Sequence, residues 1–226
     1  MKIGVLGTGS VGQTIAAKLA ELGHDVMVGT RDPAATLART EPDRFGNPPL
    51  KTWLAGRERV ELGTFAQAAA RGELVVNATS GDVSLEVLRA AGGDHLAGKV
   101  LVDIANPLDF SRGFPPTLSV CNTDSLAEQI QRAVPAARVV KTLNTVNATL
   151  MVEPGRLAGG DHTMFMCGDD AAAKATVAEL LESFGWRDVV DLGALSNARA
   201  TEMLLPIWVR LFGHLKTPAF NFKLVR

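Results

Sequence analysis

Short apolar runs alternate with amphipathic stretches along most of the chain, which is the pattern of strands alternating with helices. The first apolar run, residues 2–6, leads into a glycine-rich turn and then a helical pattern that starts at Val11 and stops at Gly23. This alternation predicts a Rossmann-type α/β fold with a doubly wound parallel sheet. Further strands of that sheet are expected at 25–29, 60–63, 74–78, 100–104 and 138–143.

The last part of the chain has a different pattern. Strands are expected at 163–167 and 189–192, with an amphipathic helix between them. Ser196 is expected to cap a long final helix, and Pro206 is expected to kink it. Whether these elements extend the first sheet or form a separate layer does not follow from the pattern.

We expect a Rossmann domain over residues 1–144 and a small C-terminal α/β unit over residues 145–226. The length of 226 residues, with 46% apolar and 21% charged positions, is typical of a globular protein. The 23 basic and 24 acidic residues nearly cancel, so neither nucleic acid nor a membrane surface is an expected partner. The first residues already form a strand, and isolated Cys121 and Cys167 fit reduced thiols, so a cytoplasmic location is expected.

The turn after the first strand has the spacing of a dinucleotide-binding fingerprint. A first glycine allows a tight turn, a second lets a pyrophosphate approach the backbone, and a third lets the helix pack on the strand. The N–H groups and positive dipole of the helix would face the diphosphate. The residues that fit G-x-G-x-x-G are Gly7, Thr8, Gly9, Ser10, Val11 and Gly12.

The end of the second strand favours NADP(H) over NAD(H). NAD-binding folds place a carboxylate there to bind the ribose 2′-hydroxyl, whereas this chain has Thr30 and Arg31. A hydroxyl and a guanidinium would bind a 2′-phosphate, although Arg31 could also be an ordinary solvated charge. Asp32 precedes Pro33, so we interpret it as the cap of the next helix.

Loops after three later strands are the other expected cofactor contacts, because ligands of doubly wound sheets bind beyond the carboxyl ends of the strands. Small and amide side chains there would hold a ribose and a carboxamide without covering a flat ring. The alternative is that these residues only make turns. The residues expected at the cofactor are Ala78, Thr79, Ser80, Asn106, Asn144 and Ala148.

No pair of side chains suited to proton transfer stands out, and no catalytic residue or metal ligand is predicted. His162 could face a cleft, and Lys141 lies in a strand and could point either way. The absence of tyrosine excludes the short-chain dehydrogenase mechanism. Hydride transfer between two flat rings needs little acid–base help, because the cofactors carry that chemistry.

Nearly the whole chain resembles the NADP reductases that depend on the deazaflavin coenzyme F-420. The resemblance rests on the glycine turn, on Gly29-Thr30-Arg31, and on the stretches 139–148, 167–170 and 195–199. The cytoplasmic reductase domain of membrane ferric reductases looks similar over the first part. Either resemblance implies an NADP-dependent oxidoreductase, and the first also implies a homodimer.

The family resemblance implies a role for each matching residue. Thr8, Gly9, Ser10 and Val11 would hold the diphosphate, and Thr30 with Arg31 would hold the 2′-phosphate. Residues 79–80 would lie near the ribose, whereas Asn144 and Ala148 would flank the nicotinamide where a second ring stacks.

The leading hypothesis is hydride transfer between NADP(H) and a small-molecule redox co-substrate, with coenzyme F-420 as the best guess. One alternative is an NADPH-dependent reductase of another flavin, a quinone or a small carbonyl compound, the last of which would need a proton donor. Another alternative is an NADP-sensing module without enzymatic activity.

Overall fold

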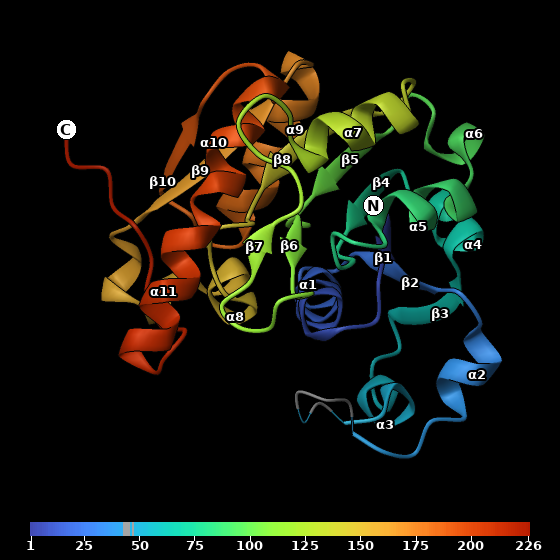
Figure 1. The fold of residues 1–226 in the computed structure, drawn as a ribbon. Coiled ribbons are helices and arrows are strands. Elements are labelled where there is room, and N and C mark those ends of the chain that lie inside the picture. Colours follow the sequence, from blue (N-terminus) through green and yellow to red (C-terminus); the bar gives the residue numbers. More distant parts are fainter. Residues whose placement is uncertain (43–45, 47) are drawn as a thin grey trace.

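A computed structural model of the protein describes residues 1–42, 46 and 48–226, and one large sheet runs through this part of the chain. In this described part the sheet has eight strands in the order β10-β9-β8-β5-β4-β1-β2-β3 (Figure 1). A separate hairpin pairs β6 with β7. The strands are β1 Lys2–Leu6, β2 Asp25–Thr30, β3 Val60–Thr64, β4 Leu74–Asn77, β5 Val100–Asp103, β6 Leu108–Asp109, β7 Thr117–Leu118, β8 Arg138–Thr142, β9 Thr163–Gly168 and β10 Asp188–Asp191.

Helices cover both faces of the sheet, as a doubly wound fold requires. The helices are α1 Ser10–Glu21, α2 Pro33–Leu37, α3 Leu50–Leu54, α4 Phe65–Arg71, α5 Ser84–Ala91, α6 Gly93–Leu96, α7 Leu126–Ala133, α8 Ala148–Val152, α9 Ala171–Ser183, α10 Ala198–Met203 and α11 Leu205–Leu215. The described part of the chain also has the 3₁₀ turns η1 Pro154–Arg156, η2 Ala158–Gly160 and η3 Leu195–Asn197.

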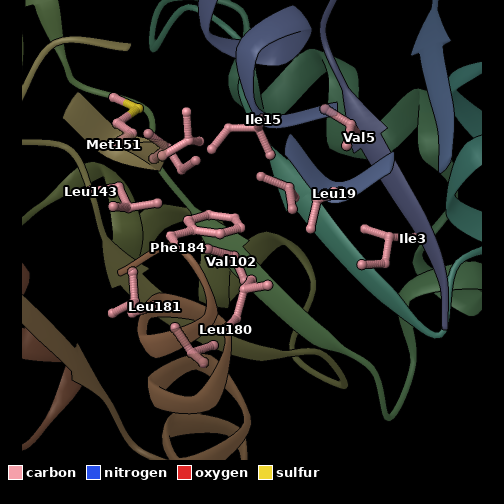
Figure 2. Packing of buried hydrophobic residues seen from close by; sticks show 14 of the residues in the cluster. Ile3, Val5, Ile15, Leu19, Val102, Leu143, Met151, Leu180, Leu181 and Phe184 are labelled. Atoms are coloured by element: carbon pink, nitrogen blue, oxygen red, sulfur yellow. The ribbon is translucent and has the colours of Figure 1, made fainter. Parts of the chain in front are cut away.

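The core has two layers, one on each face. Side chains of α1, α8 and α9 form one layer, and Figure 2 shows Ile15 and Leu19 of α1 near Phe184 at the end of α9. Helices α4, α5, α6 and α7 form the other layer, with Leu88 and Ile130 fully buried. Strands between two apolar layers need continuous apolar sequence, which is why β4 and β5 are buried at every position.

The predicted Rossmann-type fold is confirmed, with one exception to the parallel order. Strand β9 runs antiparallel to β8, with Val140 opposite Gly168. The chain between them contains the five-residue helix α8 and two 3₁₀ turns rather than a helix long enough to return along the sheet. Strands β9 and β10 thus extend the first sheet, and the domain boundary at residue 144 stays a prediction.

The predicted cap at Ser196 is wrong, and the predicted kink at Pro206 takes the form of a break between two helices. Ser196 caps no helix, because it is exposed within η3 and the helical segment after it is split at Leu204 into α10 and α11. Pro206 lies in the first turn of α11, where its missing N–H needs no partner. Short elements that the pattern did not reveal are α5, α6, α8, β6 and β7.

The side-chain caps at the starts of α2, α4 and α7 differ in completeness. The Asp32 side chain caps α2, and Thr64 forms a complete capping box with Gln67 at α4. Ser125 caps α7 by accepting from the Glu128 N–H, but Glu128 does not reach back to the Ser125 backbone. Its carboxylate binds Arg199 of α10 instead, and this hydrogen bond lowers the pKa of Glu128.

Neither cysteine forms a disulfide. Cys121 is exposed and Cys167 is buried, and burial raises the pKa of the Cys167 thiol to about 12. Among the described residues, none of the helices combines the length and the apolar character that crossing a bilayer requires.

Candidate functional site

The glycine turn, residues 7–12, connects β1 to α1 at the carboxyl edge of the sheet. Gly7 has a φ of +117°, and a Cβ there would lie 2.7 Å from the Ala78 carbonyl oxygen. A Cβ on Gly12 would lie 2.1 Å from the Gly7 carbonyl oxygen, so only glycine fits beside the strand. A Cβ on Gly9 would meet nothing within 4 Å. The turn is therefore tightly packed at Gly7 and Gly12, whereas the space beside Gly9, at the start of the helix, is open.

Side chains around the glycine turn hold its shape. Gln13 donates from Nε2 to the Thr8 carbonyl oxygen at 2.8 Å. A groove of about 500 Å³, here called the α2–α3 groove, opens beside Thr8 and Gly9 and continues past Thr36 and Arg39. The turn thus borders an open space large enough for part of a nucleotide.

Thr30 and Arg31, predicted at the 2′-phosphate, differ in their surroundings. Thr30 is buried, and its hydroxyl lies 2.9 Å from the Thr36 hydroxyl. Arg31 is exposed and its guanidinium binds the exposed Glu86 carboxylate at 2.9 Å. Neither residue is among those that line the α2–α3 groove. An exposed ion pair of this kind is stabilised by only about 0–1 kcal/mol, so the guanidinium can exchange Glu86 for another anion.

A second pocket of about 250 Å³, here called the strand-end pocket, lies at the carboxyl ends of β4, β5 and β8. It is lined by aliphatic, aromatic, hydroxyl and amide side chains, and no lining residue is ionisable. Predicted site residues in its lining are Val11, Ala78, Thr79, Asn106, Asn144 and Ala148. Ser80 is exposed and is not among the lining residues.

Several lining residues were not predicted from the sequence. They are Ile104, Met151, Leu205 and Trp208, whereas the remaining lining residues, Ala105, Leu108, Val146 and Asn147, lie in the loops that were expected at the cofactor. Leu205 and Trp208 belong to α11, more than fifty residues after the last predicted site residue. Only the path of the chain back over the sheet brings this helix to the pocket.

Two amide side chains that line the pocket, Asn106 and Asn144, are joined by hydrogen bonds. Asn144 donates from Nδ2 to Asn106 Oδ1 at 2.9 Å, and Asn106 donates from Nδ2 to the Asn144 carbonyl oxygen at 2.8 Å. Asn144 Nδ2 also lies 3.2 Å from the Thr201 carbonyl oxygen of α10. These bonds orient both amides before any ligand binds.

Lys141 points into the interior, where it contacts two carboxylates. Its Nζ lies 2.8 Å from Asp103 and 2.9 Å from Glu202. Burial disfavours the ammonium, but attraction to the two carboxylates outweighs it and raises the pKa of Lys141 above its ordinary value. Lys141 is not among the residues that line the strand-end pocket, so the ammonium is not placed to meet a ligand there.

His162 does not face a cleft, contrary to the expectation. It is 3% exposed, its Nε2 lies 3.0 Å from the Pro154 carbonyl oxygen, and its Nδ1 lies 2.8 Å from Asn221 Nδ2. Its ring packs edge-on against Trp186. Both ring nitrogens are engaged in hydrogen bonds within the protein, so we interpret His162 as a structural residue.

The arrangement suits chemistry in which the ligands supply the reactive atoms. Within the described residues, no group of three or more His, Cys, Asp or Glu side chains could hold a metal ion. The strand-end pocket offers apolar surfaces and fixed amides, which can align flat rings and exclude water. It offers no acid or base for proton transfer.

Comparison with known proteins agrees with this picture. The family model for NADP oxidoreductase, coenzyme F-420-dependent, matches residues 2–107. A crystal structure from Arthrobacter sp. FB24, provisionally called an F-420-dependent NADP-reductase, is 62% identical over 100% of both chains, with a TM-score of 0.95. The chain belongs to the coenzyme F-420-dependent NADP oxidoreductase family. The predicted family and the predicted class of NADP-dependent oxidoreductase are thereby confirmed.

More distant relatives cover the chain to different extents. The F-420-dependent NADP reductase of Methanocaldococcus jannaschii is 26% identical and aligns over 93% of this chain and 92% of its own length. Metalloreductase STEAP3 of Rattus norvegicus is 30% identical over 92% of this chain, so that similarity extends beyond the first part. The chain spans only 38% of the length of this metalloreductase.

Proposed function

We propose that this member of the family transfers a hydride between NADP(H) and coenzyme F-420, with both rings in the strand-end pocket. The observation that carries the proposal is the uncharged pocket directly beside an open glycine turn. Such a pocket suits a reaction between two flat rings, which needs alignment rather than a proton donor.

The glycine turn is the proposed diphosphate site. The open direction at Gly9 leaves room for the diphosphate against the backbone, and Ser10 and Val11 begin the helix whose positive end faces it. We assign Arg31 to the 2′-phosphate, which would take the guanidinium from Glu86. A bidentate contact to a phosphate dianion is stronger than the exposed carboxylate pair that it replaces.

The amide pair is the proposed support for the nicotinamide. NADPH supplies a hydride from its nicotinamide ring and becomes NADP⁺, and the deazaflavin accepts that hydride and its electron pair. Asn106 and Asn144 would hold the carboxamide side of the ring, and Ala148 would leave a face free for the second ring. Any further proton is exchanged with solvent, because the lining residues include no acid or base.

The same lining argues against a carbonyl or imine substrate, whose reduction requires a proton at the oxygen or nitrogen. Lys141 and His162, the two candidates for a donor, are held in other contacts. A flavin or quinone acceptor shares the flat ring of the deazaflavin, so the experiment has to compare these acceptors directly.

The test is anaerobic stopped-flow of the purified protein with NADPH and F-420, with FMN and FAD as alternative acceptors. We expect rapid formation of reduced F-420 and slow or absent reduction of FMN and FAD. Tight NADPH binding without transfer to any acceptor would contradict the proposal and favour the NADP-sensing role.

Arg31→Ala tests the coenzyme assignment in the same assay. Charge-assisted bonds contribute roughly 1.5–3 kcal/mol, so NADPH affinity should fall about tenfold to a hundredfold while NADH affinity stays unchanged. Arg59→Ala is the matched control, because Arg59 also forms an exposed pair, with Asp25 at the other end of β2. Equal losses in both variants would contradict the assignment of Arg31.

We also propose that the chain acts as a homodimer. The support is a group of exposed apolar side chains on α11 and the β6–β7 hairpin, among them Ile207 at 50% and Phe114 at 61% exposed. Phe114 packs edge-on against Phe212, which joins the hairpin and the helix into one surface.

A further inference from the structure

A buried cluster of three charges lies next to the loops of the strand-end pocket. Lys141 and Asp103 are inaccessible to solvent and Glu202 is 1% exposed. A single charge is strongly disfavoured in an apolar interior, so each member depends on the position of the others. A displacement of β5, β8 or α10, which contribute these three side chains, would separate the charges and is therefore strongly disfavoured.

One side of the cluster holds the loops after β4 and β5. Lys141 Nζ donates to the Ala105 carbonyl oxygen, and Asp103 Oδ1 accepts from the Ala105 N–H at 3.2 Å. Asp103 Oδ1 also accepts from Asn77 Nδ2 at 2.8 Å, and Asn77 Oδ1 accepts from the Thr79 hydroxyl at 2.6 Å. Ala105 and Thr79 line the pocket, so this half of the cluster orders its loop side.

The other side of the cluster holds the C-terminal helices. Glu202 Oε2 accepts from the Leu126 N–H at 2.8 Å, and its Oε1 accepts from the Ala127 N–H at 3.1 Å. The carboxylate thus sits between Lys141 and the positive end of α7. It can leave neither partner without exposing an unpaired charge or unpaired N–H groups to an apolar interior.

Glu202 is also directly joined to the pocket wall. The carbonyl of its neighbour Thr201 accepts from Asn144, and Leu205 and Trp208 follow on α11 as lining residues. The Glu202 carboxylate is therefore linked through its own helix to the Leu205 and Trp208 wall of the pocket.

We propose that Glu202 is a positioning residue that sets the distance between the α11 wall and the cofactor loops through its contact with Lys141. This inference rests on the proposed function, in which the second ring lies against that wall. Glu202 touches neither ring. Its effect is on the alignment of the rings and on acceptor binding rather than on NADPH binding, because the Asp103–Lys141 pair still holds the loops after β4 and β5 without it.

Glu202→Gln tests this role. The amide keeps the shape and one oxygen for the α7 N–H groups but loses the negative charge that attracts Lys141. Glu128→Gln is the matched control, since Glu128 also joins α7 to α10, through Arg199 at 2.6 Å, but does so away from the strand-end pocket. Comparison of the two variants separates the buried cluster from a general weakening of the same helix contact.

The measurements are the Kd for NADPH by fluorescence titration, and the KM for F-420 and the single-turnover rate of hydride transfer. For Glu202→Gln we expect an NADPH Kd within about twofold of the native value, with hydride transfer slowed about tenfold to a hundredfold and a raised KM for F-420. Glu128→Gln should stay close to the native protein in all three. Should Glu202→Gln not fold, Glu202→Asp keeps the charge and should show a smaller loss with the same division between NADPH and acceptor.

If the native protein transfers a hydride to F-420, two results would overturn the inference alone. One is a Glu202→Gln variant that transfers the hydride as fast as the native protein, and the other is a variant that loses NADPH affinity and transfer rate to the same extent. Absence of transfer in the native protein, with any acceptor, would instead overturn the proposed function and the inference together.

Discussion

At the scale of single residues, Gly9 and Gly12 serve opposite purposes although both belong to one turn. The site of a Cβ on Gly12 is occupied by the Gly7 carbonyl oxygen, whereas the space at Gly9 is open. Gly12 is therefore required by the fold itself. Gly9 has an extended conformation that any residue can adopt, so the fold does not require a glycine there, and we propose that the diphosphate does.

This difference predicts distinct effects of two alanine substitutions. Gly12→Ala should destabilise the protein by about 1–3 kcal/mol, because the backbone must move apart. Gly9→Ala should leave the melting temperature unchanged and weaken NADPH binding about tenfold or more, since its methyl group fills the approach of the diphosphate. Thermal unfolding and NADPH titration of both variants check this. A loss of stability in Gly9→Ala would contradict the assignment of the open turn to the ligand.

At the scale of elements, the starts of α4 and α10 differ in whether the local sequence determines where the helix begins. Thr64 precedes α4 and forms both bonds of a capping box with Gln67. Ser196 also precedes a helical stretch, but Arg199 stands where a capping box needs Glu or Gln, and Ser196 lies inside η3. The start of α10 is set by packing of the buried Ala198 and by the Glu202 contacts, which no local pattern contains.

We therefore expect unequal effects from removing the two hydroxyls. Thr64→Ala should lower the free energy of unfolding by about 1 kcal/mol, because an N–H at the start of α4 loses its partner. Ser196→Ala should change it by less than about 0.5 kcal/mol, as is usual for an exposed residue. Denaturant unfolding measures both values. A comparable loss in Ser196→Ala would show that its hydroxyl caps a helix after all.

At the scale of the whole molecule, exposed apolar side chains on α11 and the β6–β7 hairpin support the proposed dimer. We expect a mass of twice 23.9 kDa in analytical ultracentrifugation. Ile207→Glu should shift the protein to the monomer, because the charge would be buried in the interface. Leu22→Glu, at an exposed apolar residue after α1, should leave the dimer intact. A monomer at working concentration in the native protein would contradict the proposal.

The sequence predicted those parts of the site that are continuous along the chain. The β1–α1–β2 segment, its glycine turn and the loops with Asn106 and Asn144 depend on neighbours within a few residues, so the local pattern contains the information. It did not reveal which way Lys141 points, because a strand presents side chains to both faces and the partner of Lys141 at Glu202 lies 61 positions away.

What the sequence determined by itself is the type of fold and the glycine turn between β1 and α1. Each follows from spacing and residue chemistry that act locally. Only the tertiary structure decided the antiparallel direction of β9, the closing of the pocket by Leu205 and Trp208, and the burial of Asp103, Lys141 and Glu202 as one cluster. These features depend on contacts between segments that are distant in the sequence. Such contacts contribute to the free energy of folding only once the folded chain has brought the segments together.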